Sequence, residues 1–260
     1  MNLRSYGESP FSIVVLHGGP GAPREMAPVA RELSSLGGVL EPLQIKLSLE
    51  GQIIELHNII EKHCNAPVTL IGWSWGAILG YMFSSRYPSL VRKLILVSSG
   101  VFEEKYAANI MNMRLARLTQ EDRNQVVSLM EQLEIPLASD KDTLLYRAGK
   151  LIFKADSYEP LSADTEVLQC YYATYHNVWQ QASELRRRGV LLQSGRNISC
   201  LVVALHGDYD PHPPEGIREP LSRVLKDFHF ILLEKCGHYP WLEKEAKRGF
   251  YHILKNMIEA

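Results

Sequence analysis

The chain has 260 residues, of which 46% are hydrophobic and 22% are charged, and its formal net charge is −1. This composition is typical of a globular protein with a large core, and the near-neutral charge argues against nucleic acid as a partner, since a phosphate backbone usually demands a basic face. The four cysteines are far apart and form no CxxC pair, so we expect reduced thiols rather than disulfides or a zinc site. No apolar run reaches the roughly 18 residues of a membrane helix, and the N-terminus has no secretory signal pattern, so we expect a cytoplasmic protein without a membrane partner.

Short apolar runs alternate with helical patterns along the first hundred residues. The apolar runs predict strands at 11–18, 39–45, 67–73 and 92–99. The helical patterns predict helices at 24–38, 49–64 and 77–87. Strands of nearly continuous apolar character that alternate with helices predict a mostly parallel sheet with helices on both faces. In such sheets the functional site lies at the carboxyl ends of the strands.

The middle of the chain has helical patterns only. The sequence TQED at 119–122 predicts a capped helix start, and further helices are expected at 141–155 and 162–189. The α/β alternation then resumes with a strand at 198–207, a helix at 215–227, a strand at 229–234 and a last helix at 240–260. We therefore predict an α/β core formed by residues 1–100 and 196–260, with a helical cap inserted over residues 101–195.

The sequence GWSWG, residues 72–76, lies between a predicted strand and a predicted helix. This context is the one required of a nucleophile elbow, the tight turn that holds a serine hydroxyl out above a sheet. The turn demands small neighbours, which explains Gly72 and Gly76. Ser74 is therefore the candidate nucleophile.

A serine hydroxyl needs a base, and the base needs an acid that orients it. In an elbow fold these follow the serine in the order acid, then histidine. His238 comes just after the strand at 229–234, and Asp208 and Asp210 come just after the strand at 198–207. We favour Asp210 because it lies further past the strand and is followed by Pro211; Asp208 is the alternative.

The sequence HGGPG, residues 17–21, follows the first predicted strand. Glycines allow backbone N–H groups to approach a substrate closely. Acyl transfer needs two such donors, one from the residue after the nucleophile and one from this loop. We expect the oxyanion hole to be formed by the backbone N–H groups of Trp75 and Gly19, and we expect His17 to order the loop.

Four motifs, HGGPG, GWSWG, HGDYDP and CGHYPW, follow one another in this order between residues 13 and 241. Together they resemble the α/β-hydrolase family. The resemblance implies an α/β-hydrolase fold, a Ser74–Asp210–His238 triad, no cofactor, and a helical cap inserted after the strand that follows the elbow helix. Family members usually carry two further antiparallel strands at the N-terminus, and only about ten residues precede the HGGPG strand here, so the resemblance implies a shortened sheet.

Within the family, HGGPG together with S-W-G is similar to the proline iminopeptidase branch. This sequence departs from that branch at Trp73, where the branch has glycine, and at Pro211, where it has the glutamate that binds a free α-amine. An esterase-like activity is therefore favoured, and an aminopeptidase activity is the alternative. Glu159, Glu166 and Glu184 of the cap are the candidates for an amine site.

Two other classes compete with a serine hydrolase. His206, Asp208, Asp210 and His212 recur at period two, which on a strand would align four metal ligands, as in a metal-dependent hydrolase. Gly207 and Pro211 disfavour that strand, and a metal site would leave the elbow unexplained. The third class is a non-catalytic ligand-binding protein on a hydrolase scaffold.

We therefore predict a serine hydrolase that cleaves a small ester, thioester, lactone or amide through an acyl-enzyme, without metal or cofactor. Trp73, beside the nucleophile, and Trp179, in the cap, are the candidates for contact with the substrate. The sequence leaves the natural substrate and the oligomeric state open.

Overall fold

A computed structural model of the protein describes residues 2–136, 138–162, 167 and 169–259. The strands are β1 (Leu3–Tyr6), β2 (Phe11–Leu16), β3 (Gly38–Pro42), β4 (Val68–Trp73), β5 (Val91–Val97), β6 (Leu201–Gly207) and β7 (Phe228–Leu233). The longer helices are α1 (Ala27–Leu33), α2 (Leu49–His63), α3 (Trp75–Arg86), α5 (Ile110–Arg117), α6 (Gln120–Glu134), α7 (Lys141–Asp156), α8 (Tyr172–Arg187), α10 (Glu215–Val224) and α11 (Ala246–Glu259). Short helices are α4 (Glu104–Ala107) and α9 (Val190–Ser194), with 3-10 turns at Pro88–Leu90 and Gly195–Asn197.

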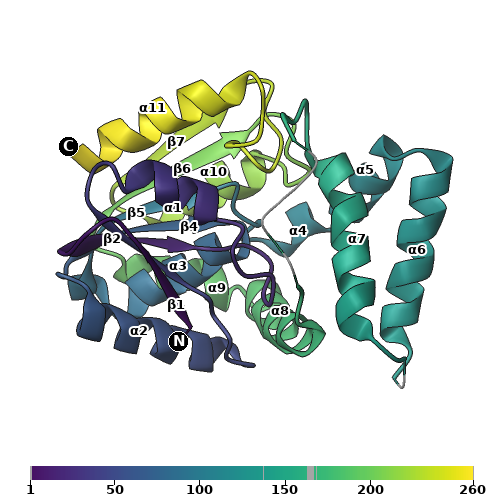
Figure 1. Ribbon diagram of the computed structural model, residues 1–260, viewed down its shortest axis with the longest axis horizontal. Coiled ribbons are helices and arrows are strands. Elements are labelled where there is room, and N and C mark those ends of the chain that lie inside the picture. The colour runs from purple at the N-terminus through teal and green to yellow at the C-terminus, as the bar shows by residue number, and fades with distance from the viewer. Residues whose placement is uncertain (1, 137, 163–166, 168, 260) are drawn as a thin grey trace.

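The strands form one seven-stranded sheet in the order β1-β3-β2-β4-β5-β6-β7 (Figure 1). All neighbouring pairs from β3 to β7 are parallel, and β1 alone pairs antiparallel, with β3. This arrangement confirms the predicted α/β-hydrolase fold with a mostly parallel sheet. The elbow strand β4 lies in the middle of the sheet, so the loops that follow β2, β5 and β6 can approach the turn after it.

Alternation along the strands sends side chains to two separate cores, one on each face of the sheet. Val14 and Leu16 of β2 pack with α2, α3 and α10, whereas Ile13 and Val15 pack with α1 and α11. Both sets of side chains are fully buried. Burial on both faces explains why the strands read as continuous apolar runs in the sequence.

Several boundaries differ from the sequence prediction. β1 was not predicted, because LRSY is a short, partly exposed edge strand without an apolar run. The first helix begins at Ala27 rather than at 24, because Arg24 has a positive φ of 83°. The last helix begins at Ala246 rather than at 240, because the residues before it bond to another segment: Leu242 accepts from Leu161, and Lys244 donates to Glu159.

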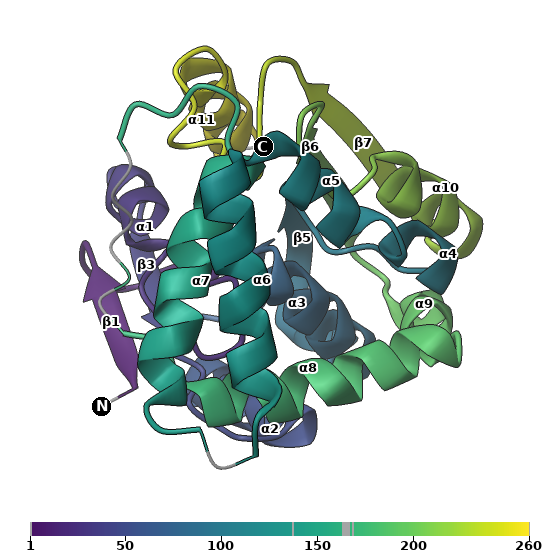
Figure 2. The ribbon, with the colours of Figure 1, turned by 90° about the vertical axis from the view of Figure 1, so that its right-hand side faces the viewer.

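The predicted cap contains helices α4 to α9 and no strand within its described residues. Thr119 caps α6 as the TQED motif predicts, its hydroxyl accepting from the N–H of Asp122 at 3.2 Å. The helix predicted over 162–189 is α8, which begins at Tyr172; residues 163–166 and 168 lie outside the described residues. Helices α6 and α7 lie side by side in front of the sheet, with α8 crossing below them (Figure 2). The boundaries of the cap at 101 and 195 remain a prediction.

Within the described part of the chain, no helix combines the length and the apolar character that crossing a bilayer requires.

Candidate active site

The elbow turn places Ser74 between β4 and α3 in a strained backbone conformation. Its φ is 52° and its ψ is −112°, values that a residue other than glycine rarely adopts. A Cβ on Gly72 would lie 2.2 Å from the carbonyl oxygen of Gly76, and a Cβ on Gly76 would lie 2.3 Å from that of Leu16. The two glycines are therefore required by the close approach of the backbone, as the motif predicts.

Three distant segments bring Ser74, His238 and Asp210 together. The Nε2 atom of His238 lies 3.0 Å from the hydroxyl oxygen of Ser74, and its Nδ1 atom lies 2.7 Å from Oδ2 of Asp210. His238 and Asp210 are each only 3% exposed, so water does not compete strongly for these hydrogen bonds. The arrangement is one in which His238 can take the serine proton while Asp210 fixes the orientation of the ring.

Asp208, the alternative acid, points elsewhere. It is exposed, and its Oδ1 atom accepts a hydrogen bond from the backbone N–H of Cys236 at 3.0 Å. It thereby ties the loop after β6 to the loop that carries His238. The two aspartates thus take part in the same loop pair, but only Asp210 contacts the imidazole.

The surroundings of Asp210 favour its ionised form. Burial opposes ionisation, but attraction to the neighbouring imidazoles, above all that of His238, outweighs it and holds the pKa of this carboxyl well below its ordinary value. An ionised Asp210 stabilises the imidazolium that forms when His238 takes a proton.

The HGGPG loop lies beside the elbow. Gly19 has a φ of +37° and, like Trp75, lines the cavity that contains Ser74. His17 is fully buried, and its ring nitrogens lie 2.7 Å and 3.1 Å from the carbonyl oxygens of Gly18 and Leu43. Because both nitrogens of His17 face backbone carbonyls, its side chain can order the loop but does not face the cavity.

A cavity of about 400 Å³ lies between the sheet and the cap helices, with Ser74 and His238 in its wall. Side chains of α5, α7 and α8, among them Ile110, Phe153 and Trp179, supply much of its lining. The lining is mainly apolar, which suits a small substrate with an acyl chain or ring.

The two tryptophans predicted to contact a substrate both line this cavity. Trp73 is 2% exposed, and its indole N–H donates to the carbonyl oxygen of His238 at 2.7 Å. Trp73 therefore supports the loop of the histidine as well as the cavity wall. The ring of Trp179 packs edge-on against that of Trp75 at 6.4 Å between centroids.

Glu25 is a cavity residue that belongs to none of the sequence motifs. It lines the cavity, and its Oε2 atom is buried without a hydrogen-bond partner among the described residues. Burial raises the pKa of this carboxyl well above its ordinary value. The sequence offered one indication that Glu25 lies near the site, which is its position four residues after the HGGPG loop.

The glutamates named as candidates for an amine site do not occupy the cavity. Glu159 forms an exposed ion pair with Lys244, and Glu184 forms one with Arg187. Glu166 lies outside the described residues. Among the described residues, Glu25 is the glutamate that lines the cavity.

Two buried acidic residues, Asp156 and Glu243, connect the predicted cap to the loop of His238. Asp156, at the end of α7, forms a two-pronged ion pair with Arg114 of α5, and its carbonyl oxygen accepts from the N–H of His238 at 2.7 Å. Glu243 is fully buried and accepts from the backbone N–H groups of Tyr158, Glu159 and Gly237 at 2.8, 2.8 and 3.0 Å.

Replacing Glu243 with glutamine should lower the free energy of unfolding by about 1–3 kcal/mol, because the amide NH₂ would face at least one of the three N–H donors and leave it unpaired. Urea unfolding measures the change. Glu245→Gln, an equivalent change at an exposed position two residues away, should stay within about 0.5 kcal/mol of the original protein. Equal losses in both variants would contradict this role of Glu243.

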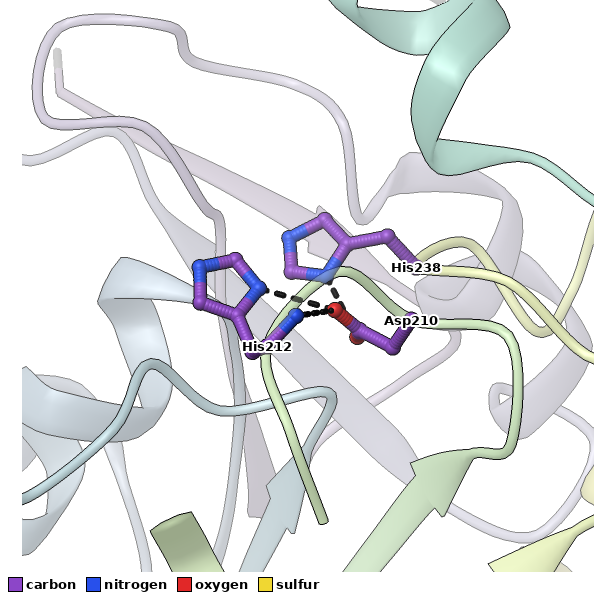
Figure 3. A group of neighbouring side chains, drawn as sticks. All are labelled: Asp210, His212 and His238. Carbon is purple, nitrogen blue, oxygen red and sulfur yellow. Dashed lines mark hydrogen bonds and ion pairs between the residues drawn. The ribbon is translucent and has the colours of Figure 1, made fainter. Parts of the chain in front are cut away.

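The structure does not align His206, Asp208, Asp210 and His212 as the four ligands of one metal site. Among the described residues, the group whose atoms could hold an ion is Asp210, His212 and His238, with ligand atoms within 4.8 Å of one another (Figure 3). His206 and Asp208 are not in this group, because the chain turns at Gly207, where β6 ends. Both imidazoles also hydrogen-bond to Asp210, so the carboxylate already has partners within the group.

Known proteins resemble this chain over most of its length. The alpha/beta hydrolase family model matches residues 13–248. A 2-hydroxy-6-oxo-2,4-heptadienoate hydrolase of Pseudomonas putida is 22% identical over 272 aligned positions, which cover 95% of this chain and 89% of the relative. A pimeloyl-(acyl-carrier protein) methyl ester esterase of Neisseria meningitidis is 22% identical over 206 positions, which cover 77% of this chain and 72% of the relative.

Among solved structures, the proline iminopeptidase of Mycobacterium smegmatis superposes with a TM-score of 0.63 at 16% identity, and the alignment covers 99% of this chain and 93% of that one. At this identity the likeness concerns the fold. Because the family match spans nearly the whole chain and the relatives are named as a hydrolase and an esterase, this protein is an enzyme of the alpha/beta hydrolase family.

Proposed function

We propose that the protein is a serine hydrolase that cleaves a small ester, thioester, lactone or amide through an acyl-enzyme. The observation that carries the proposal is the continuous hydrogen-bonded chain from Ser74 Oγ through His238 to Asp210, with distances of 3.0 and 2.7 Å, in the wall of a largely apolar cavity. We further propose a cytoplasmic location, which the four free cysteines favour.

In this mechanism, Ser74 attacks the carbonyl carbon while His238 takes the proton from the hydroxyl group. The N–H groups of Gly19 and Trp75 stabilise the oxyanion, a contribution that typically amounts to about 3–4 kcal/mol for one donor. His238 then gives its proton to the leaving group, and the carbonyl bond to that group breaks. Water, activated by the same imidazole, hydrolyses the acyl-enzyme and regenerates Ser74.

A fluorophosphonate probe tests this assignment directly. We expect one covalent adduct per chain, located on Ser74 when the labelled protein is digested and its peptides are sequenced by mass spectrometry. An adduct on another residue, or no adduct together with hydrolysis that a chelator abolishes, would overturn the proposal and favour a metal-dependent hydrolase.

A second candidate is an aminopeptidase-like activity on substrates with a free amine. The buried Oε2 atom of Glu25, which has no hydrogen-bond partner among the described residues, favours it. An ammonium group beside Glu25 would supply the charge partner that the described residues do not provide. Against it, Pro211 occupies the position at which the similar iminopeptidase branch has its amine-binding glutamate.

Comparing p-nitrophenyl esters of graded acyl length with aminoacyl-p-nitroanilides, proline included, decides between the two activities. A preference for short esters supports the esterase-like activity, as do relatives named as a methyl ester esterase and a dienoate hydrolase. A preference for free-amine substrates that is lost in Glu25→Gln would establish the second candidate.

A further inference from the structure

Asp210 is shared by two imidazoles. His212, two residues further along the chain, donates its backbone N–H to Oδ1 of Asp210 at 2.9 Å, and its Nδ1 atom lies 2.8 Å from the same oxygen. His238 occupies the other oxygen, Oδ2, at 2.7 Å. Figure 3 shows the two rings on the same side of the carboxylate, each with one nitrogen turned toward it.

The ring of His212 is also held against that of His238. The ring centroids are 4.9 Å apart and the planes are inclined by 29°, so the two rings stack. On the other side, the carbonyl oxygen of His212 accepts from Nε2 of the buried His206 at 2.7 Å, which fixes the backbone at this point. His212 is therefore constrained by its neighbours on two sides and is 7% exposed.

The protonation state of His212 follows from its surroundings. Burial is the main influence and, despite the attraction of Asp210, lowers the pKa of His212 to about 4. A neutral ring carries one proton, and the contact with Oδ1 of Asp210 requires that proton on Nδ1. A neutral His212 thus acts as a donor to Asp210 and does not compete with His238 for the proton of the serine.

We propose that His212 is a positioning residue for the triad: its hydrogen bonds hold one oxygen of Asp210 so that the other oxygen stays aligned with His238. The inference rests on the proposed serine-hydrolase function. In that reaction His212 forms no bond with the substrate; it acts through Asp210 and His238.

Three substitutions separate the hydrogen bond from the bulk of the ring. His212→Asn can place an amide N–H near the position of Nδ1, His212→Gln extends its amide to the position of Nε2, and His212→Leu keeps volume but has no donor. We expect kcat for a p-nitrophenyl ester to fall about 10- to 100-fold in the Leu and Gln variants, with KM unchanged, since a hydrogen bond to a charged group is lost. The Asn variant should stay within about threefold of the original protein.

Far-UV circular dichroism and urea unfolding show which variants fold. If His212→Leu does not fold, the comparison of His212→Asn with His212→Gln still tests the inference. Unchanged kcat in all folded variants, an Asn variant as slow as Gln, or a loss confined to KM would each overturn the inference. Fluorophosphonate labelling of Ser74 in the unaltered protein distinguishes failure of the two proposals. If no adduct forms on Ser74, the proposed function is wrong. If the adduct forms, the kinetics of the His212 variants test the role of His212 alone.

Discussion

Ser74→Ala should lower kcat for a p-nitrophenyl ester by on the order of 10⁴- to 10⁶-fold and abolish labelling by a fluorophosphonate. In the proposed mechanism the serine oxygen is the atom that becomes acylated, so without it the remaining groups would provide only substrate binding and oxyanion stabilisation. The fold should survive, because Ser74 is the N-cap residue of α3 but its side chain makes no capping hydrogen bond. Steady-state kinetics and intact-protein mass spectrometry measure the two effects.

Ser84→Ala is the matched control on the same helix. Ser84 is buried, and its hydroxyl bonds back to the carbonyl oxygen of Gly80 at 2.7 Å, away from the cavity. This variant should keep its labelling and its kcat even if it loses some stability. Labelling that persists in Ser74→Ala would place the nucleophile at another residue.

Asp210→Asn should lower kcat by about 10⁴-fold, because an amide NH₂ facing Nδ1 of His238 favours the wrong tautomer of the ring. The stacked ring of His212 and the bond from Trp73 to His238 stay in place, so the geometry of the site should change little. The loss should therefore appear in kcat and in the rate of labelling of Ser74. A folded Asp210→Asn variant with nearly full activity would contradict the triad.

Asp208→Asn makes the same chemical change two residues away. Its side-chain oxygen can still accept from the N–H of Cys236, and the residue is exposed. We expect kcat within about threefold of the original protein. A large loss here with little at Asp210 would restore Asp208 as the acid that orients His238.

The cap explains why the site depends on residues far from the motifs. Segment 156–161 bonds to the chain around 237–244, through Asp156, Glu243 and the backbone contacts of Leu161. The predicted cap and the loop of His238 are therefore coupled, and a change at the end of α7 can reach His238 through the hydrogen bond from its N–H to the carbonyl oxygen of Asp156. No periodicity in either segment indicates this pairing, because the donors in these bonds are backbone N–H groups, which nearly every residue type carries.

The sequence by itself determined the alternating α/β pattern, the elbow at Ser74, and His238 as its partner. These features depend on short-range physics: continuous apolar runs for buried parallel strands, glycines where backbones nearly touch, and a chain order that the fold imposes. The tertiary structure decided the rest. Which of two nearby aspartates faces His238 depends on how two loops pack, and Glu25 and His212 acquire their significance only from burial and from neighbours distant in the sequence. Such properties belong to the environment of a residue rather than to its type, so only the folded chain could reveal them.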